Sequence, residues 1–261
     1  DRYDYKEENY FDTKMLIQSN QDETDSLIYL YEDQNVTSRL NIRGQPKLFP
    51  FGNIKLNTNI SAWIENNKLI IKNNKNFFTM LLHEMALQGK HNVYNSMAAG
   101  IAASSIGIKN EIIKKSLLDF KGLEHRLEFV GKISGIDFIN DSKATNCNSV
   151  YYALDSIKTP IIWICGGVDK GNNYSGLKDL VESKVKSIIY LGKSPRKIQN
   201  SFKSLVSNIT IVDTMKDAVT CSYSNAEPGD TVLLSPACSS FDLFQNYQER
   251  GQLFKSCVLE L

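Results

Sequence analysis

Hydrophobic and polar positions follow two different patterns along this chain, and the change falls near Gly122. After it, short apolar runs rich in β-branched residues alternate with segments of helical period. This strand, helix, strand order is typical of a parallel sheet covered by helices on both faces. Strands are expected at 126–131, 136–140, 160–165, 187–191, 209–212 and 231–234, and helices at 146–156, 174–183, 195–204, 215–225 and 245–259. Residues 123–261 are therefore predicted to form a Rossmann-like, mostly parallel α/β domain.

The pattern before Gly122 is less regular. A short helix is expected at 12–18, a strand at 26–31, and several short strands separated by Asn-rich turns between 47 and 79. Helices are expected at 91–105 and 109–120, the second ending at Gly122, as helices commonly do at glycine. Residues 1–122 are interpreted as part of an α/β domain. An incomplete parallel sheet there predicts open edges, uncovered apolar faces and poor solubility or association.

Composition narrows the classes of partner. The 261 residues carry 30 basic and 29 acidic side chains, so nothing suggests the basic surface that nucleic acid requires. No apolar run approaches the roughly 20 residues of a membrane span. The five cysteines contain no C-x-x-C pair, which argues against a disulfide framework or a zinc site and favours a reduced, cytoplasmic protein. A small molecule is the expected partner.

Polar residues follow three of the expected strands, at 140–146, 166–171 and 235–242. Ligands of open α/β sheets bind at the carboxyl ends of strands, so these three segments predict one active-site rim. Within the third segment, Cys238 has no histidine nearby in sequence, which argues against a nucleophile.

Glycine motifs for phosphate are incomplete. Gly192-Lys193-Ser194 follows a strand and matches the end of G-x-x-x-x-G-K-[ST], but Ser187 stands where the first glycine should be, so a surface turn is favoured. No G-x-G-x-x-G occurs in the sequence. An independent dinucleotide site is therefore unsupported.

Five spaced segments nevertheless resemble the Mur ligase family. They are 91–95, 122–126, 141–146, 166–171 and 235–242, and the last three are most similar to the members that join D-glutamate to UDP-N-acetylmuramoyl-L-alanine. The resemblance implies an ATP- and Mg²⁺-dependent amide ligase of peptidoglycan synthesis that works through an acyl phosphate. It also implies a central ATPase domain, here partial at 1–122, and a C-terminal domain at 123–261. The P-loop and a UDP-sugar-binding N-terminal part are expected to be missing, and the chain alone to have negligible ligase activity.

The resemblance assigns nucleotide contacts to three residues. It implies that Asn95 contacts adenine, that Arg126 meets phosphate oxygens and that Asp141 holds ribose hydroxyls. It also places His125 beside Arg126 at the hinge between the domains. Each nucleotide contact has a structural alternative, because Asn95 suits a helix start, Arg126 a pair with a carboxylate such as Glu128, and Asp141 a helix cap.

The remaining roles concern the amino acid and the metal. In the family, the segment that holds Lys143 lines the cleft between acyl donor and acceptor. Thr145 and Lys170 match the positions that hold the D-glutamate side-chain carboxylate, and Ser240 matches the one that takes its α-carboxylate. Tyr247 stands where phenylalanine is usual, so a backbone contact is expected to survive there. Lys14 aligns with a carbamylated lysine that helps bind a second magnesium, although its flanking residues 11–13 differ from the family pattern.

Two other classes of function remain open. A different Mur-type ligase, or one resembling folylpolyglutamate synthase, would keep the hinge and the nucleotide residues but change the amino-acid pocket. A non-catalytic binding module with a Rossmann-like domain is the second. Preference for D-glutamate over L-glutamate or a diamino acid separates the ligases, and failure to bind D-glutamate favours the module.

Overall fold

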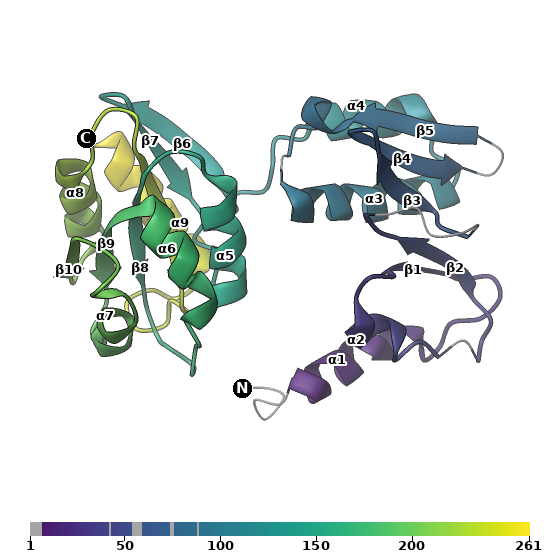
Figure 1. The fold of residues 1–261 in the computed structure, drawn as a ribbon, viewed down its shortest axis with the longest axis horizontal. Coiled ribbons are helices and arrows are strands. Elements are labelled where there is room, and N and C mark those ends of the chain that lie inside the picture. Colours follow the sequence, from purple (N-terminus) through teal and green to yellow (C-terminus); the bar gives the residue numbers. More distant parts are fainter. Residues whose placement is uncertain (1–6, 42, 54–58, 74–75, 88) are drawn as a thin grey trace. The chain divides into compact units, whose positions relative to one another are not determined.

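The chain divides at Lys121 and Gly122 into two compact units, each with its own sheet and core (Figure 1). Unit 1 is Asp1–Lys121 and unit 2 is Gly122–Leu261. The computed structural model describes residues 7–41, 43–53, 59–73, 76–87 and 89–261. Each unit is described by itself below.

Unit 2 is built on a six-stranded sheet. Its strands are β6 (Glu128–Ile133), β7 (Ile136–Asn140), β8 (Ile161–Gly166), β9 (Val185–Leu191), β10 (Asn208–Val212) and β11 (Thr231–Ala237). The strand order is β10-β9-β8-β11-β7-β6, and every pairing is parallel except that of β6 with β7. The predicted α/β class is confirmed. The edge strand β6 is antiparallel because Ser134 and Gly135, both at positive φ, form a tight turn that leaves no room for a crossover.

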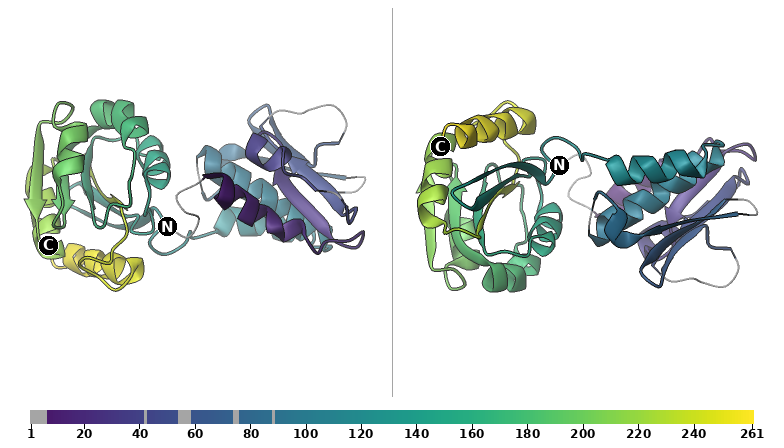
Figure 2. Two further views of the ribbon diagram at one scale, coloured as in Figure 1. Left: turned by 90° about the horizontal axis from the view of Figure 1, so that it is seen from below. Right: turned by 90° about the horizontal axis from the view of Figure 1, so that it is seen from above.

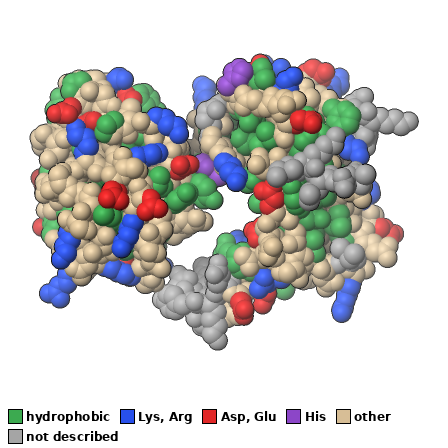
Figure 3. Space-filling view, in the orientation of Figure 1, with side chains coloured by type: hydrophobic (Ala, Val, Ile, Leu, Met, Phe, Trp, Pro, Cys, Tyr) green, Lys and Arg blue, Asp and Glu red, His purple; other side chains and the backbone are tan. Residues whose placement is uncertain are grey.

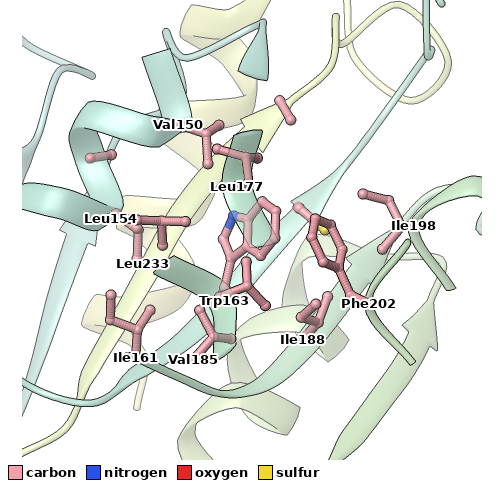
Figure 4. Packing of buried hydrophobic residues seen from close by; sticks show 14 of the residues in the cluster. Val150, Leu154, Ile161, Trp163, Leu177, Val185, Ile188, Ile198, Phe202 and Leu233 are labelled. Carbon is pink, nitrogen blue, oxygen red and sulfur yellow. The ribbon is translucent and has the colours of Figure 1, made fainter. Parts of the chain in front are cut away.

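Helices cover both faces of this sheet (Figure 2). They are α5 (Cys147–Ser156), α6 (Lys178–Lys184), α7 (Arg196–Phe202), α8 (Met215–Asn225), α9 (Tyr247–Leu259) and the 3-10 turn η3 (Ser175–Leu177). Successive residues of β8 point to opposite cores. Trp163 packs with α5 and α7 on one face (Figure 4), and its indole Nε1 donates to Ser235 O at 2.7 Å. Ile162 and Ile164 pack with α8 and α9 on the other face. This two-sided burial explains the continuous apolar run of β8.

Unit 1 contains a five-stranded sheet of order β1-β2-β3-β4-β5. Its elements are α1 (Glu7–Met15), η1 (Leu16–Gln18), β1 (Ser26–Leu30), α2 (Gln34–Thr37), β2 (Lys47–Phe51), β3 (Ala62–Glu65), β4 (Lys68–Asn73), β5 (Asn76–Leu81), η2 (Leu82–Glu84), α3 (Lys90–Ser105) and α4 (Asn110–Asp119). The pairings of β1 with β2 and of β2 with β3 are parallel, as expected. The pairings of β3 with β4 and of β4 with β5 are antiparallel, so the expectation of a parallel sheet is wrong there. Asn66 and Asn67, both at positive φ, form the two-residue turn that makes β3 and β4 an antiparallel hairpin.

One face of the unit 1 sheet carries the core. Helix α3 packs on it through Val93, Met97 and Ile101, which meet buried side chains such as Ile71, and α4 lies beside α3 (Figure 2). Hydrophobic side chains are also open to view in unit 1 (Figure 3). In the same unit, Leu48 is 39% exposed and, together with Tyr29 and other residues, lines a surface pocket of about 510 Å³. The effect of this surface on solubility stays a prediction.

Candidate functional site

The three polar segments follow strands that are neighbours in the sheet. Strands β7, β11 and β8 lie side by side and parallel, with Leu234 of β11 level with both Asn140 and Ile164. Their carboxyl ends therefore open on the same edge of unit 2. The chain reaches β8 from β7 by α5 and returns to β11 by α8, so β11 enters last, between two strands already laid down. This change of direction is where open α/β sheets bind ligands.

Backbone hydrogen bonds tie these segments together beyond the strands. Asp141 N donates to Leu234 O at 2.7 Å, and Ala237 N donates to Ala144 O at 3.0 Å. On the other side of β11, Val168 N donates to Ser239 O at 2.9 Å. Since each segment is bonded to the β11 segment, the three form one continuous rim.

Asp141 is buried at the centre of this rim. Its carboxylate accepts a hydrogen bond from Ser235 Oγ at 2.9 Å and another from Leu127 N at 3.2 Å. Burial raises the pKa of Asp141 to about 7, although both hydrogen bonds and the nearby charge of Arg126 act to lower it. The helix-cap alternative for Asp141 is wrong, because Asn146 caps α5 by accepting from Ser149 N.

His125 and Arg126 lie in a backbone segment of unusual conformation. His125 and Leu127, on either side of Arg126, have φ of 64° and 45°, in the left-handed region that side chains other than glycine rarely adopt. His125 is buried and Arg126 is exposed. Glu128, the carboxylate considered for Arg126, accepts instead from Lys255 Nζ at 2.7 Å.

An open pocket of about 650 Å³ adjoins this segment. Its lining comes from residues 123–125 near the start of unit 2, from the segment 140–146 that follows β7, and from the start of α9: Leu123, Glu124, His125, Lys143, Asn246, Tyr247, Gln248, Glu249 and Gln252. Lys143 Nζ lies 3.5 Å from the Tyr247 hydroxyl and 5.3 Å from the centre of its ring. The structure therefore brings together His125, Lys143 and Tyr247, three of the residues singled out from the sequence.

Lys170 is exposed in a loop that Asp169 organises. The Asp169 carboxylate accepts from Gly171 N at 2.7 Å, from Asn172 N at 2.8 Å and from the Tyr174 hydroxyl at 2.9 Å. Burial acts to raise the pKa of Asp169, but these hydrogen bonds prevail and hold it below its usual range. The glycine at 167 is required, because a Cβ there would lie 2.2 Å from Ser239 O.

The other two residues assigned to the amino acid lie on the same rim. Ser240 is 3% exposed, and its carbonyl accepts from Phe244 N at 2.9 Å and Leu243 N at 3.2 Å. Thr145 is exposed, and its backbone N donates to Lys143 O at 3.0 Å. That the side chains of Asp141, Thr145, Lys170 and Ser240 share one pocket stays a prediction.

Asn95 and Lys14 belong to unit 1. Helix α3 begins at Lys90 after Gly89, so Asn95 lies in its second turn, where an asparagine cannot cap the helix start. The expectation that it lies in the first turn is wrong by one turn. The side chain is exposed. Lys14 is exposed on α1, with Nζ 5.4 Å from the centre of the Tyr10 ring.

Sequence reasoning missed a buried arginine. Arg250 of α9 is 2% exposed and donates to Ser142 O at 2.8 Å, Ser142 Oγ at 3.0 Å and Cys238 O at 3.3 Å. It thus joins the β7 segment to the β11 segment. Burial lowers the pKa of Arg250 to about 10. The signal available was Gly251 beside it, because glycine inside a helical run usually has a packing reason.

Acidic groups near the hinge are already paired. The ligand atoms of Glu124, His125 and Glu128 lie within 4.8 Å of one another, a spacing that suits a cation. Lys255 Nζ occupies this position, at 2.8 Å from Glu124 and 2.7 Å from Glu128. The group is therefore a salt-bridge cluster. Burial also raises the pKa of the Cys238 thiol, which disfavours the nucleophilic thiolate, and its sulfur lies 3.5 Å from the Tyr174 hydroxyl and 3.5 Å from the Asn172 amide nitrogen.

Charges of both signs are interspersed on the face drawn in Figure 3. Across the described ranges, we find no helix with the length and apolar character needed to span a bilayer. The charged groups of the rim are the exposed side chains of Lys143, Lys170 and Arg126 and the buried carboxyl group of Asp141. Such cations suit phosphate and carboxylate ligands.

Two family models match the chain, one in each unit. The Mur ligase middle domain matches residues 1–103, and the Mur ligase, glutamate ligase domain matches residues 125–238. The second match includes all of the β7 and β8 segments of the rim and ends within the β11 segment.

Two curated relatives that match the chain over its whole length share one name. UDP-N-acetylmuramoylalanine--D-glutamate ligases from Christiangramia forsetii and Porphyromonas gingivalis are 46% and 47% identical to it over 264 residues, which is 100% of this chain. The chain spans only 59% and 58% of their lengths.

Solved structures share the fold at low identity. A pseudomurein peptide ligase type C from Methanothermus fervidus matches with a TM-score of 0.69 and 17% identity, over 97% of this chain and 59% of that one. A MurF ligase from Thermotoga maritima in complex with ADP matches with a TM-score of 0.67 and 14% identity, over 97% and 58%. These likenesses support the arrangement of elements alone.

Proposed function

This chain belongs to the Mur ligase family, and we propose that it is part of an enzyme that joins D-glutamate to UDP-N-acetylmuramoyl-L-alanine at the expense of ATP in peptidoglycan synthesis. The observation that supports this most directly is the rim itself. Three loops that carry Asp141, Lys170 and Ser240 are bonded to one another at the point where the sheet changes direction. The whole-chain identity to D-glutamate ligases supports the choice of amino acid.

The amino acid is proposed to bind along the rim. D-glutamate carries two carboxylates, and the Lys170 ammonium suits the one on its side chain, with Thr145 donating beside it. Ser240, on the neighbouring β11 segment, suits the α-carboxylate. The loop of Lys170 is held by Asp169, so the ammonium is presented from a rigid frame. Rigid positioning lowers the entropy cost of aligning the amine with its acyl target.

Nucleotide contacts are proposed for Arg126 and Asp141 of unit 2 and, through the family resemblance, for Asn95 of unit 1. Arg126 projects from a backbone fixed by bonds at His125 N and Leu127 N, and its guanidinium suits phosphate oxygens. Asp141 suits the ribose hydroxyls, and Asn95 the adenine edge. Activation of the L-alanyl carboxylate by ATP makes an acyl phosphate, whose oxygens gather negative charge as the amine attacks. Lys143 and His125, which line one pocket, are proposed to face that charge.

Magnesium belongs to the proposal through the family resemblance. Lys14 supplies a nitrogen unless it is carbamylated, whereas Mg²⁺ prefers oxygen ligands, and the acidic cluster at Glu124 and Glu128 already holds Lys255. No step is therefore assigned to a metal held by these residues. A cytoplasmic location is likewise proposed from the family alone.

The direct test uses the complete reading frame that encodes this chain. Its product, given ATP, Mg²⁺ and UDP-N-acetylmuramoyl-L-alanine, is expected to release phosphate only when D-glutamate is added, and L-glutamate is the matched control. The chain alone is expected to release none. Phosphate release that depends on L-glutamate or a diamino acid would favour a different amide ligase. D-glutamate-dependent ATP hydrolysis by the 261 residues alone would contradict the expectation that they do not catalyse the reaction by themselves.

A further inference from the structure

His125 belongs to a small buried cluster whose other members have no role in the proposed reaction. We call it the His125 cluster, and it consists of His125, Glu128, Asn140 and Gly251. His125 is 5% exposed and Asn140 is fully buried. The amide nitrogen of Asn140 lies 3.0 Å from His125 Nδ1, 3.0 Å from Glu128 Oε2 and 3.2 Å from Gly251 O.

The partners of Asn140 fix which way its amide points. Ser142 N, which can only donate, lies 3.2 Å from Asn140 Oδ1. The Glu128 carboxylate and the Gly251 carbonyl, which accept, face the amide nitrogen. A flipped amide would set donor against donor and acceptor against acceptor at all three contacts. The NH₂ group is therefore the part of Asn140 that meets His125.

This contact decides where the proton lies on the neutral imidazole ring. The two hydrogens of the Asn140 NH₂ are shared among His125 Nδ1, Glu128 Oε2 and Gly251 O, and Glu128 Oε2 lies 3.8 Å from Nδ1, beyond hydrogen-bond range. An amide NH₂ has no lone pair to offer, so an N–H on the ring nitrogen 3.0 Å from it would set donor against donor. Nδ1 of His125 must present its lone pair to Asn140. In the neutral ring the single proton is then on Nε2.

The orientation of the ring is fixed as well. Gly251 lies against it so closely that a Cβ at this position would be 2.3 Å from His125 Nδ1. The Tyr247 ring meets the imidazole edge to face, with centroids 6.1 Å apart. His125 lines the 650 Å³ pocket with Lys143 and Tyr247, while Nδ1 is engaged below. Nε2 is thus the ring atom left for a ligand, at 4.0 Å from Glu124 Oε1 and so beyond hydrogen-bond range of that carboxylate.

We propose that Asn140 is a positioning residue that fixes His125 as the Nε2–H tautomer, so that His125 donates a hydrogen bond to an anionic oxygen in the pocket and does not accept a proton there. The inference rests on the proposed function, because phosphorylation of a carboxylate is what supplies phosphoryl and acyl oxygens. A fixed donor aimed at developing negative charge stabilises it without reorganisation during the reaction. Deprotonation of the attacking amine must then fall to another group.

Nuclear magnetic resonance on this chain tests the tautomer without any activity. The protein has three histidines, so long-range ¹H–¹⁵N spectra of the imidazole rings are simple, and His125→Gln identifies the signals of His125. In alkaline buffer, where imidazole is neutral, we expect a pyrrole-type shift at Nε2 and a pyridine-type shift at Nδ1. The opposite pattern in the parent protein would overturn the proposal whatever the variants do.

Substitution tests the part played by Asn140. Asn140→Asp places a carboxylate opposite Nδ1 and is expected to move the proton to that nitrogen, whereas the control Asn225→Asp, at the end of α8, leaves the spectrum unchanged. If Asn140→Asp does not fold, Gly251→Ala serves instead, since it pushes the ring from the amide and is expected to give mixed tautomers. An unchanged His125 tautomer in whichever of these variants folds would show that Asn140 does not set it.

Kinetics of the complete enzyme separate this inference from the proposed function. Asn140→Asp is expected to lower kcat about 100-fold, the usual effect of losing one donor to an oxyanion, with little change in KM for D-glutamate. A purely structural role would instead lower the amount of folded enzyme and leave kcat per folded molecule intact. If the complete enzyme ignores D-glutamate, the proposed function fails while the tautomer result stands. If it is active with an Nδ1–H tautomer, only this inference fails.

Discussion

Replacing Gly251 by alanine should destabilise unit 2, although the same change in most helices is favourable. Gly251 lies inside α9, where alanine is preferred over glycine by about 1 kcal/mol. The added Cβ would lie 2.3 Å from Nδ1 of His125 and 2.9 Å from two of its ring carbons, whereas ordinary contacts begin near 3.4 Å. The ring must therefore move by roughly 1 Å or the helix must shift.

The expected magnitude follows from three contributions. Overpacking of a tight site costs about 1–3 kcal/mol. Moving the ring also removes one of the three acceptors around the buried amide nitrogen of Asn140, and because Glu128 Oε2 and Gly251 O remain, this loss costs at most about 1 kcal/mol. Helix propensity returns about 1 kcal/mol. The free energy of unfolding of unit 2 should fall by about 2 kcal/mol, with propensity too weak to reverse the sign.

Urea unfolding followed by tryptophan fluorescence measures this change. The protein has two tryptophans, Trp63 in unit 1 and Trp163 in unit 2, so a Trp63→Phe background lets unit 2 report alone. Gly176→Ala is the matched control, because nothing lies within 4 Å of its added Cβ, and its stability should stay within about 0.5 kcal/mol of the parent. A Gly251→Ala protein as stable as the parent would refute the packing of His125 on α9.

Three further substitutions test other parts of the structure. Burial raises the pKa of Asp141 to about 7 from the usual 3.8, so between these pH values the carboxyl group ionises in the unfolded chain first, and the stability of unit 2 falls as pH rises. Asp141→Asn should therefore leave the free energy of unfolding nearly unchanged at about pH 4 and raise it by roughly 2–4 kcal/mol at about pH 8. Urea unfolding that shows the same effect at both pH values would contradict this prediction. Lys184 Nζ donates to the carbonyls of Leu154, Asp155 and Ile157 at the end of α5. Lys184→Met should therefore lower the free energy of unfolding by about 1–2 kcal/mol, whereas Lys178→Met, at an exposed position, should not. Equal losses in the two variants would show that Lys184 does not cap α5. Asp169→Asn weakens the hydrogen bonds that hold the Lys170 loop and should raise the KM of the complete enzyme for D-glutamate about tenfold, whereas the control Asp179→Asn should not change it. An unchanged KM in Asp169→Asn would show that D-glutamate binding does not depend on these hydrogen bonds.

Periodicity was sufficient to locate the elements of unit 2, because its central strands β8 and β11 are buried throughout and its helices bury one face. The run at 161–165 can only be a central strand or a buried helix, and its length and β-branched residues favour the strand. Unit 1 was harder. Its sheet turns antiparallel at Asn66 and Asn67, and an Asn-Asn pair between two apolar runs was the signal for a hairpin. That signal was interpreted only as a turn.

The site residues that follow strands could be predicted from the sequence, whereas those contributed by helix α9 could not. Asp141, Lys170 and Ser240 follow directly from strands, so their common edge could be inferred from the sequence. Arg250 lies 108 residues from Ser142, and Gly251 lies 111 residues from Asn140. Helical period alone does not say which side of α9 faces these residues. Asn140 lies in the polar segment 140–146, which the sequence analysis placed at a strand end. Its contact with His125 depends on side-chain geometry that no spacing encodes.

One measurement tests most directly whether the three loops form a single site for an acidic amino acid. D-glutamate is titrated into the ¹⁵N-labelled chain, and backbone amide shifts are followed, with L-glutamate as the control. We expect residues 141–146, 166–171 and 238–242 to shift together and to saturate with one dissociation constant, and Lys170→Gln to weaken that response. Shifts confined to one loop, scattered over unit 2, or equal for both enantiomers would contradict the shared site.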